Sequence, residues 1–296
     1  MYSEAISEDQ EIRCAEPDGS EKTEREEHGM IIIGEKINGA IPSVAKAIEE
    51  KNEDWIRDLA KRQSDAGADY IDVCSSVMDK DVETLKWLID LVQEVCDTRI
   101  CIDSPSAKSI VEAIPFCSKP GIINSVSLEG DKIETVFPVI SGTDWECIAL
   151  LSGKSRISES VDERIEIFEQ IMEKAKEYQI KPEKLHIDPL VFSVGTNPES
   201  FSGYAQVSRH IKEKYPQVHI TSGLSNISFG IPSRKTMNQA FLILAMQAGM
   251  DCAIIDPTNR DMIGSIFATE ALLEMDEYCI EYIGAYNEGR FGVKKS

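Results

Sequence analysis

The sequence predicts one α/β domain, a TIM (β/α)8 barrel of eight parallel strands that alternate with helices. Eight short apolar runs, separated by helix-like stretches, lie between residues 31 and 280, and this alternation is typical of a parallel sheet closed into a barrel. Most of the runs end on a carboxylate or a carboxamide, and strand ends of this kind converge on one mouth of a barrel. The runs lie at 31–35, 70–72, 100–103, 122–124, 147–150, 185–188, 220–223 and 253–256.

The stretches between these runs carry apolar residues at helical spacing. Residues 43–66 are expected to form one helix that ends at Gly67, and residues 81–96 and 160–178 repeat the pattern. Residues 237–248 are almost wholly apolar, so we expect this helix to be buried on all sides. A dimer interface and packing against the barrel would each explain its apolar surface.

The length of 296 residues suits one barrel and is too short for a barrel with a second full domain. Residues 1–29 are rich in Glu and Asp and nearly free of apolar residues, so we expect a disordered acidic extension. The barrel is expected to occupy residues 30–296, because Met30 directly precedes the first strand.

Composition and charge exclude several classes of protein. A net charge of -21 disfavours nucleic acid as a partner. The sequence contains no apolar run of the roughly 18 residues that a membrane span needs. The eight cysteines form no C-x-x-C pair and the four histidines form no zinc-binding pattern. We therefore expect a cytoplasmic protein that binds no metal itself and has no membrane partner.

The polar residues at the predicted mouth suit a flat heterocycle. Each of them alone is explained by a loop or helix cap, but together they form a ring of carboxylates and carboxamides. The sequence has no Ser/His/Asp order and no G-x-S-x-G motif, which argues against a hydrolase. Asp accepts hydrogen bonds from N–H groups, and Asn offers a donor and an acceptor in one plane. The edge of a 2-amino-4-oxo-pteridine has matching groups.

Five segments carry a family resemblance. They are GEKIN at 34–38, CIDS at 101–104, INS at 123–125, HIDPL at 186–190 and GLSNIS at 223–228. In order and spacing they resemble the methyltetrahydrofolate:corrinoid methyltransferases, and also the folate module of cobalamin-dependent methionine synthase. The resemblance covers about residues 30 to 285 and implies a pterin-binding barrel.

The resemblance also implies roles for single residues. Asp103, Asn124 and Asp188 match the residues that hold the pterin edge in the family. Asn226 matches an Asn that reaches towards N5, the atom that carries the methyl group, and Arg234 matches an Arg near the pterin. We expect Asn226 and Asp188 to be catalytic, because a network of these two side chains and water would handle the N5 proton.

Glu35 and Asp72 complete the predicted pterin-binding set. Related sequences have an Asn two residues after the Asp that matches Asp72, whereas this chain has Cys74. Glu35 lies in the first motif, although a helix cap or a salt bridge with Lys36 would also explain it.

The implied reaction moves a methyl group between N5 of tetrahydrofolate and the cobalt of a corrinoid, in either direction. Tetrahydrofolate and 5-methyltetrahydrofolate are the expected substrates. The chain has no D-x-H-x-x-G corrinoid-binding motif. The corrinoid is therefore expected on a partner protein that docks over the barrel mouth, and the family resemblance implies a homodimer.

Two alternatives remain at this stage. A dihydropteroate synthase shares the barrel and the pterin, but its first-strand loop resembles N-x-T-P-D-S-F, whereas residues 35–39 read EKING. The other alternative is a non-catalytic folate-binding subunit, which a turnover assay distinguishes from an enzyme.

Overall fold

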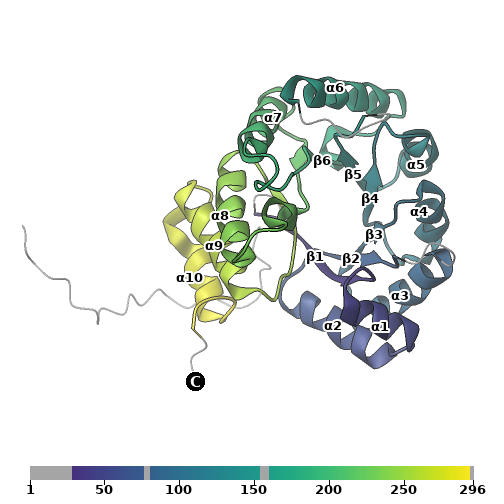
Figure 1. The fold of residues 1–296 in the computed structure, drawn as a ribbon. Helices are drawn as coiled ribbons and strands as arrows, with labels where there is room; N and C mark the ends of the chain where they lie inside the picture. Colours follow the sequence, from purple (N-terminus) through teal and green to yellow (C-terminus); the bar gives the residue numbers. More distant parts are fainter. Residues whose placement is uncertain (1–28, 77–80, 154–159, 294–296) are drawn as a thin grey trace, which may run out of the picture.

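The computed structural model describes residues 29–76, 81–153 and 160–293, and these residues form a single barrel (Figure 1). The predicted acidic extension lies outside the described residues except for Gly29. All strand pairs are parallel, in the order β7-β6-β5-β4-β3-β2-β1-β8, and a bridge between Gly223 and Ile254 closes the barrel. The strands are β1 (Ile31–Asn38), β2 (Tyr70–Cys74), β3 (Arg99–Asp103), β4 (Ile122–Val126), β5 (Glu146–Leu150), β6 (Leu185–Asp188), β7 (His219–Ile220) and β8 (Cys252–Ile255).

Helices surround the strands (Figure 1). Within the described residues, no helix is both long and apolar enough to span a bilayer. The helices are α1 (Pro42–Glu49), α2 (Glu53–Asp65), α3 (Asp81–Val95), α4 (Ala107–Ala113), α5 (Lys132–Ile140), α6 (Val161–Glu177), α7 (Ser200–Lys214), α8 (Arg234–Gln247), α9 (Arg260–Leu272) and α10 (Ile280–Asn287).

Two predicted helices differ from the structure. The helix expected at 43–66 is divided into α1 and α2, because Lys51 adopts a positive φ of 52° and the Asn52 side chain caps α2 by accepting a hydrogen bond from the Trp55 amide. The helix expected to be buried on all sides, α8, instead exposes Ile243 and Leu244 by 40% and 47%. Its inner face packs on the barrel, and its outer face contributes to an apolar surface.

The barrel interior is a thin apolar layer with polar groups on both sides. Successive side chains of a strand point to opposite faces of the sheet. On β3 this alternation gives Arg99, Cys101 and Asp103 one common face. The interior layer consists of Ile33, Tyr70, Cys101, Ile122, Ile148 and Cys252, packed against Ile31, Leu150 and Ile254. A larger apolar core fills the space between the strands and the helices.

A charged network lies on the N-terminal side of this layer. Glu146 accepts hydrogen bonds from Tyr70 at 3.0 Å and from His186 at 2.7 Å. The His186 ring stacks on His219, which contacts Asp251 at 3.1 Å. These partners lower the pKa of Glu146 in spite of its burial, while burial lowers the pKa of His186. The pair is therefore a carboxylate that accepts from a neutral imidazole.

Candidate functional site

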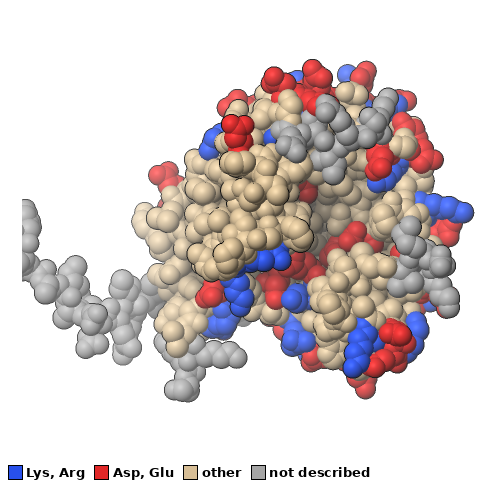
Figure 2. Space-filling view, in the orientation of Figure 1, with Lys and Arg blue, Asp and Glu red and all other residues tan. Residues whose placement is uncertain are grey.

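The C-terminal ends of the strands form a hollow in the middle of one face. Figure 2 shows Asp and Glu side chains on the floor of this hollow, with Lys and Arg beside it. The strand register explains how distant residues meet there. Asp103 pairs with Cys74 on one side and with Asn124 on the other, and Leu150 pairs with Asp188. The structure thus brings together the strand-end residues that the sequence predicted.

Asp72 and Asn124 form the first contact of the site. The Asn124 carboxamide donates a hydrogen bond of 3.2 Å to Asp72. Asp72 is only 3% exposed and lies within β2, two residues before its end. Burial, followed by the nearby charge of Asp103, raises the pKa of Asp72 well above its usual range, although the Cys101 thiol and Asn124 donate to it. The hydrogen bond to Asp72 therefore fixes the orientation of the Asn124 carboxamide.

Asp103 is the half-buried carboxyl group beside Asn124. Burial raises its pKa to about 6, although a hydrogen bond from the Cys74 thiol acts in the opposite direction. The charge of Asp81, at the start of α3, raises the pKa further. Asp81 itself is held by the hydroxyls of Ser75 and Ser104, the latter at 2.5 Å. Asp103 has thus lost much of its hydration and is surrounded by acidic neighbours.

Asp188 and Asn226 approach the mouth from β6 and from the short 3-10 helix at Leu224–Ser228, labelled η5. Asp188 accepts hydrogen bonds from the backbone amides of Leu190, at 2.8 Å, and Gly223. Burial nevertheless raises the pKa of Asp188 to about 6. Asn226 is exposed, and a Cβ built on Gly223 would lie 3.2 Å from its Nδ2 atom. Gly223 therefore lies in contact with both predicted catalytic side chains.

Arg234 stabilises the segment that carries Asn226. Its guanidinium donates to the Ser228 hydroxyl at 3.0 Å and to the Ser225 carbonyl at 2.8 Å. Both acceptors belong to η5. The sequence predicted that Arg234 binds the pterin; its contacts in the structure are those of a residue that positions η5.

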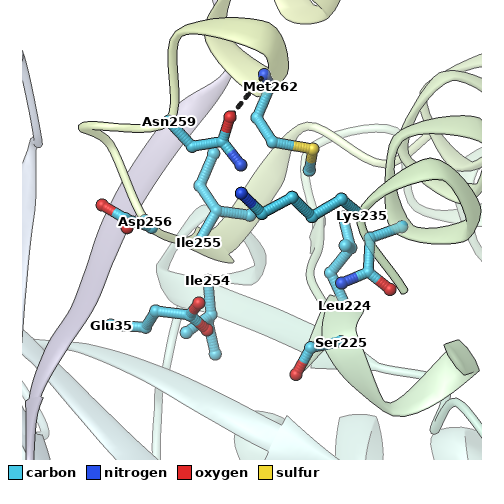
Figure 3. A pocket seen from close by; sticks show the side chains of 10 residues that line it. Glu35, Leu224, Ser225, Lys235, Ile254, Ile255, Asp256, Asn259 and Met262 are labelled. Carbon is cyan, nitrogen blue, oxygen red and sulfur yellow. Dashed lines mark hydrogen bonds between the residues drawn. The ribbon is translucent and has the colours of Figure 1, made fainter. Parts of the chain in front are cut away.

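Glu35 lies on the β8 side of the mouth (Figure 3). The pairing of β1 with β2 shifts between Gly34 and Ile37, so Glu35 lies inside the strand and not at its end. Burial raises the pKa of Glu35 to about 6, against the charge of Lys36. Lys36 forms a salt bridge of 3.3 Å with Asp256.

Four further residues of the site were not predicted from the sequence: Lys36, Asp256, Asp81 and Cys101. Asp256 could have been found, because it follows Cys252 and Ile254 at the two-residue spacing that points side chains into the barrel. Asp81 and Cys101 become visible only through their hydrogen bonds. No group of three or more His, Cys, Asp or Glu residues in the described part of the chain is arranged to hold a metal ion.

The sequence signature of a known family spans most of the barrel. Residues 35–256 match the family described as pterin binding enzyme. The chain belongs to the pterin-binding enzyme family. This membership fits the ring of carboxyl and carboxamide groups at the mouth.

Two relatives show which members of the family this pterin-binding enzyme resembles. It is 48% identical over 266 residues to the methylcorrinoid:tetrahydrofolate methyltransferase of Eubacterium limosum, covering 89% of this chain and 98% of that protein. The resemblance to the corrinoid methyltransferases is therefore confirmed. It is 28% identical over 250 residues to the methionine synthase of Mycobacterium leprae, and this match covers 78% of the chain but only 21% of that larger protein.

Solved structures confirm the fold of this pterin-binding enzyme. A dihydropteroate synthase from Yersinia pestis matches with a TM-score of 0.59 and 19% identity, covering 83% of this chain and 93% of that chain. The dihydropteroate synthase from Clostridium difficile matches with a TM-score of 0.64 and 20% identity, covering 83% and 98%. At this level of identity the likeness shows the barrel alone.

Replacing Asp103 of this pterin-binding enzyme by Asn should stabilise the empty protein. Because the folded state raises the pKa of Asp103 from 3.8 to about 6, ionisation of this group lowers stability as the pH rises between those values. At pH 7.5 we expect Asp103→Asn to raise the free energy of unfolding by about 1 to 3 kcal/mol. Urea denaturation at pH 4 and pH 7.5 measures this change.

The control for this experiment is Glu166→Gln, which alters an exposed carboxylate on α6. It should leave the pH dependence unchanged. A loss of stability at pH 7.5 in Asp103→Asn would show that the Asp103 carboxylate is well solvated or paired. Its ionisation would then not destabilise the folded protein.

Proposed function

We propose that this enzyme transfers a methyl group between N5 of tetrahydrofolate and the cobalt of a corrinoid held by a partner protein. The observation that carries the proposal is the mouth itself, in which Asp103, Asn124 and Asp188 converge in a relative of a methylcorrinoid:tetrahydrofolate methyltransferase. The methionine synthase relatives agree with folate chemistry on this barrel.

The proposed pterin-binding groups match the edge of the ring. Buried carboxyl groups gain from ligand N–H donors, because such donors favour the charged form. The 2-amino and ring N–H groups of a pterin are donors of this kind. The Asn124 carboxamide, held by Asp72 at 3.2 Å, supplies both a donor and an acceptor. A pterin bound here would offset the burial that raises the pKa of Asp103 and Asp188.

The name of the Eubacterium limosum relative has methylcorrinoid as donor and tetrahydrofolate as acceptor, and we propose the same direction here. The N5 lone pair attacks the methyl carbon of methyl-Co(III), and the electron pair of the Co–C bond stays on the metal as Co(I). N5 then loses its proton. The protein must therefore accept one proton for each methyl group that is transferred.

We propose that Asn226 and Asp188 manage this proton. Asn226 lies against Gly223, and the Gly223 amide donates to Asp188. A carboxamide can rotate to present a donor or an acceptor to N5, and Asp188 has a pKa of about 6, which lets it accept a proton near neutral pH. The reverse reaction would use the same groups to deliver a proton to N5.

We propose that the corrinoid protein docks over the mouth, where a loop tip offers an apolar contact. Phe229 follows η5 and is 71% exposed. The tip is held in place by a 2.6 Å hydrogen bond from the Ser193 hydroxyl to the Phe229 carbonyl and by a 3.0 Å bond between the Val194 amide and the Ile227 carbonyl. An exposed aromatic residue on a fixed loop is a typical anchor for a protein partner.

We also propose that the enzyme is a cytoplasmic homodimer. The exposed apolar residues of α8 and α9 support a second copy as the neighbour: Ile243 and Leu272 line one shallow depression and are 40% and 82% exposed. All seven cysteines of the described residues are free thiols, as expected in a reducing compartment. Cell fractionation tests the location.

Replacing Asn226 by Ala should lower kcat about 100-fold and change the Kd for 5-methyltetrahydrofolate less than tenfold, because the lost hydrogen bond strengthens in the transition state. Stopped-flow spectroscopy of the methylcorrinoid protein measures turnover, and calorimetry measures affinity. Asn287→Ala, an exposed change on α10, is the control. Full turnover in Asn226→Ala would contradict the role, and no turnover in the wild type would favour a non-catalytic subunit.

Replacing Phe229 by Ser should raise the KM for the corrinoid protein about tenfold and leave folate affinity unchanged, because a partner anchor is lost and the pterin groups are intact. Phe229→Leu keeps an apolar side chain, so its KM for the corrinoid protein should stay close to that of the wild type. Steady-state kinetics with varied corrinoid protein provides the measurement. An unchanged KM in Phe229→Ser would place the docking surface elsewhere.

Replacing both Ile243 and Leu272 by Asp should convert the dimer into a monomer, because burying two charges at an interface is unfavourable. Light scattering coupled to size-exclusion chromatography reports the mass. The control is Val139→Asp, which changes an exposed apolar residue of α5, away from α8 and α9. A double variant that remains dimeric would show that α8 and α9 do not form the interface.

A further inference from the structure

A buried arginine contacts the residues that follow β6. Arg164 belongs to α6, which lies beside α7 on the outside of the barrel (Figure 1). Its side chain is only 2% exposed. Charged side chains are almost never buried to this extent unless their polar groups are paired, so the contacts of the guanidinium indicate what this residue does.

The guanidinium of Arg164 holds the turn after β6. Its Nη1 atom donates to the carbonyl groups of Pro189 and Leu190, at 2.8 and 3.4 Å. Its Nε atom donates to the Ser160 carbonyl at 3.3 Å, directly before α6. Hydrogen bonds from a charged donor are roughly twice as strong as neutral ones. Arg164 therefore ties α6 to the two residues that directly follow Asp188.

This turn directs a backbone amide at Asp188. Leu190 has a positive φ of 67°, a conformation that residues other than glycine seldom adopt, and its amide donates to the Asp188 carboxyl group at 2.8 Å. Such a conformation persists only where the surrounding structure holds it. Arg164 holds the carbonyl groups on either side of this torsion, so it stabilises the conformation that gives Asp188 its amide donor.

Helix α7 leaves room for the guanidinium. A Cβ atom built on Gly203 would lie 2.5 Å from the Nη2 atom of Arg164, closer than packed atoms can approach. Glycine inside a helix is unfavourable relative to alanine, so the space that Arg164 needs explains a glycine at this position. Any larger residue at 203 would displace the guanidinium.

The charge of Arg164 also acts on Asp188. Burial raises the pKa of Asp188, while two backbone amides and the charge of Arg164 act in the opposite direction. Tyr204 on α7 also faces Asp188, but burial and the Asp188 charge raise the pKa of Tyr204, so it stays neutral. The neighbouring strands place uncharged groups there, with Leu150 paired on β5 and Gly223 after β7.

We propose that Arg164 is a positioning residue for Asp188, which holds the turn whose amide binds the carboxyl group and places a buried positive charge beside it. This inference rests on the proposed function, in which Asp188 binds the pterin and accepts the N5 proton. Both tasks need the ionised carboxylate. Arg164 acts through Asp188 without touching the substrate, and it extends the range of pH in which the site works to lower values.

The experiment measures two quantities that depend on different parts of this arrangement. Carbon-13 NMR of the ligand-free protein, labelled in its aspartate carboxyl groups, gives the pKa of Asp188, and loss of a signal in Asp188→Asn assigns it. Calorimetry gives the Kd of 5-methyltetrahydrofolate. Arg164→Met should raise the pKa of Asp188 by about one unit, because the positive charge is lost. It should also weaken folate binding at pH 7.5 about tenfold.

Two further variants keep the charge and disturb the hydrogen bonds. Arg164→Lys lacks the planar fork, and Gly203→Ala displaces the guanidinium. Both should leave the pKa of Asp188 near that of the wild type and weaken folate binding three- to tenfold. The control is Gly284→Ala on α10, where an added Cβ has open space. It should change neither quantity.

A merely structural role for Arg164 would lower Tm and leave both quantities unchanged in the folded protein. An unchanged pKa of Asp188 in Arg164→Met would therefore overturn the inference. If Arg164→Met does not fold, Gly203→Ala decides, and wild-type folate affinity in that variant would overturn it. Failure of the proposed function is distinguishable, because the NMR titration needs no ligand. A wild type that binds no folate contradicts the function, whereas a raised pKa in Arg164→Met still supports the link to Asp188.

Discussion

The site depends on the closure of eight strands into a barrel with a side-chain period of two. Once the segment after β7 meets β8 at Gly223 and Ile254, every second side chain of each strand must point inward. One apolar layer, which includes Ile33 and Ile148, then fills the interior. The next inward residues towards the C-terminal end are Glu35 and Asp103, so these polar groups gather at the mouth because the pleat leaves no other place for them.

Carboxyl groups are buried both at the mouth and in the charged network on the N-terminal side of the interior layer, here called the floor of the barrel. Their pKa values shift in opposite directions. On the floor, Glu146 is buried but receives hydrogen bonds from Tyr70 and His186, and its pKa is lowered. At the mouth, burial prevails at Asp103 and Asp188, and both have pKa values of about 6. Floor carboxylates therefore stabilise the fold above their unfolded pKa and lose that effect as the pH falls. Mouth carboxyls reduce stability as the pH rises towards 6, and a ligand that donates N–H groups would restore it.

The sequence predicted the barrel and the strand-end residues because both follow from local periodicity. Asp103 and Asn124 could be identified from their place at the ends of apolar runs, and the parallel register brought them together. Features that depend on side-chain partners were not accessible. The ion pair of Lys36 with Asp256 joins residues that are distant in sequence, and Arg234 forms hydrogen bonds to η5 that no spacing rule indicates. The break between α1 and α2 depends on the positive φ of Lys51, and a lysine in the sequence does not indicate that conformation.

The two sides of the mouth differ in how they are built, and this difference fits a reaction between a small substrate and a large one. Asp103, Asn124 and Asp188 project from strands, whose register fixes their positions. Asn226 instead lies on η5, a single short turn held by the Arg234 hydrogen bonds and by the contact of Val194 with Ile227. Preorganised groups on strands suit recognition of a rigid ring, because they lose little freedom when it binds. The proposed catalytic residue, Asn226, therefore lies on the same segment as Phe229, the proposed contact for the partner protein, and the hydrogen bonds of Arg234 and Val194 would hold both residues in place when that protein docks.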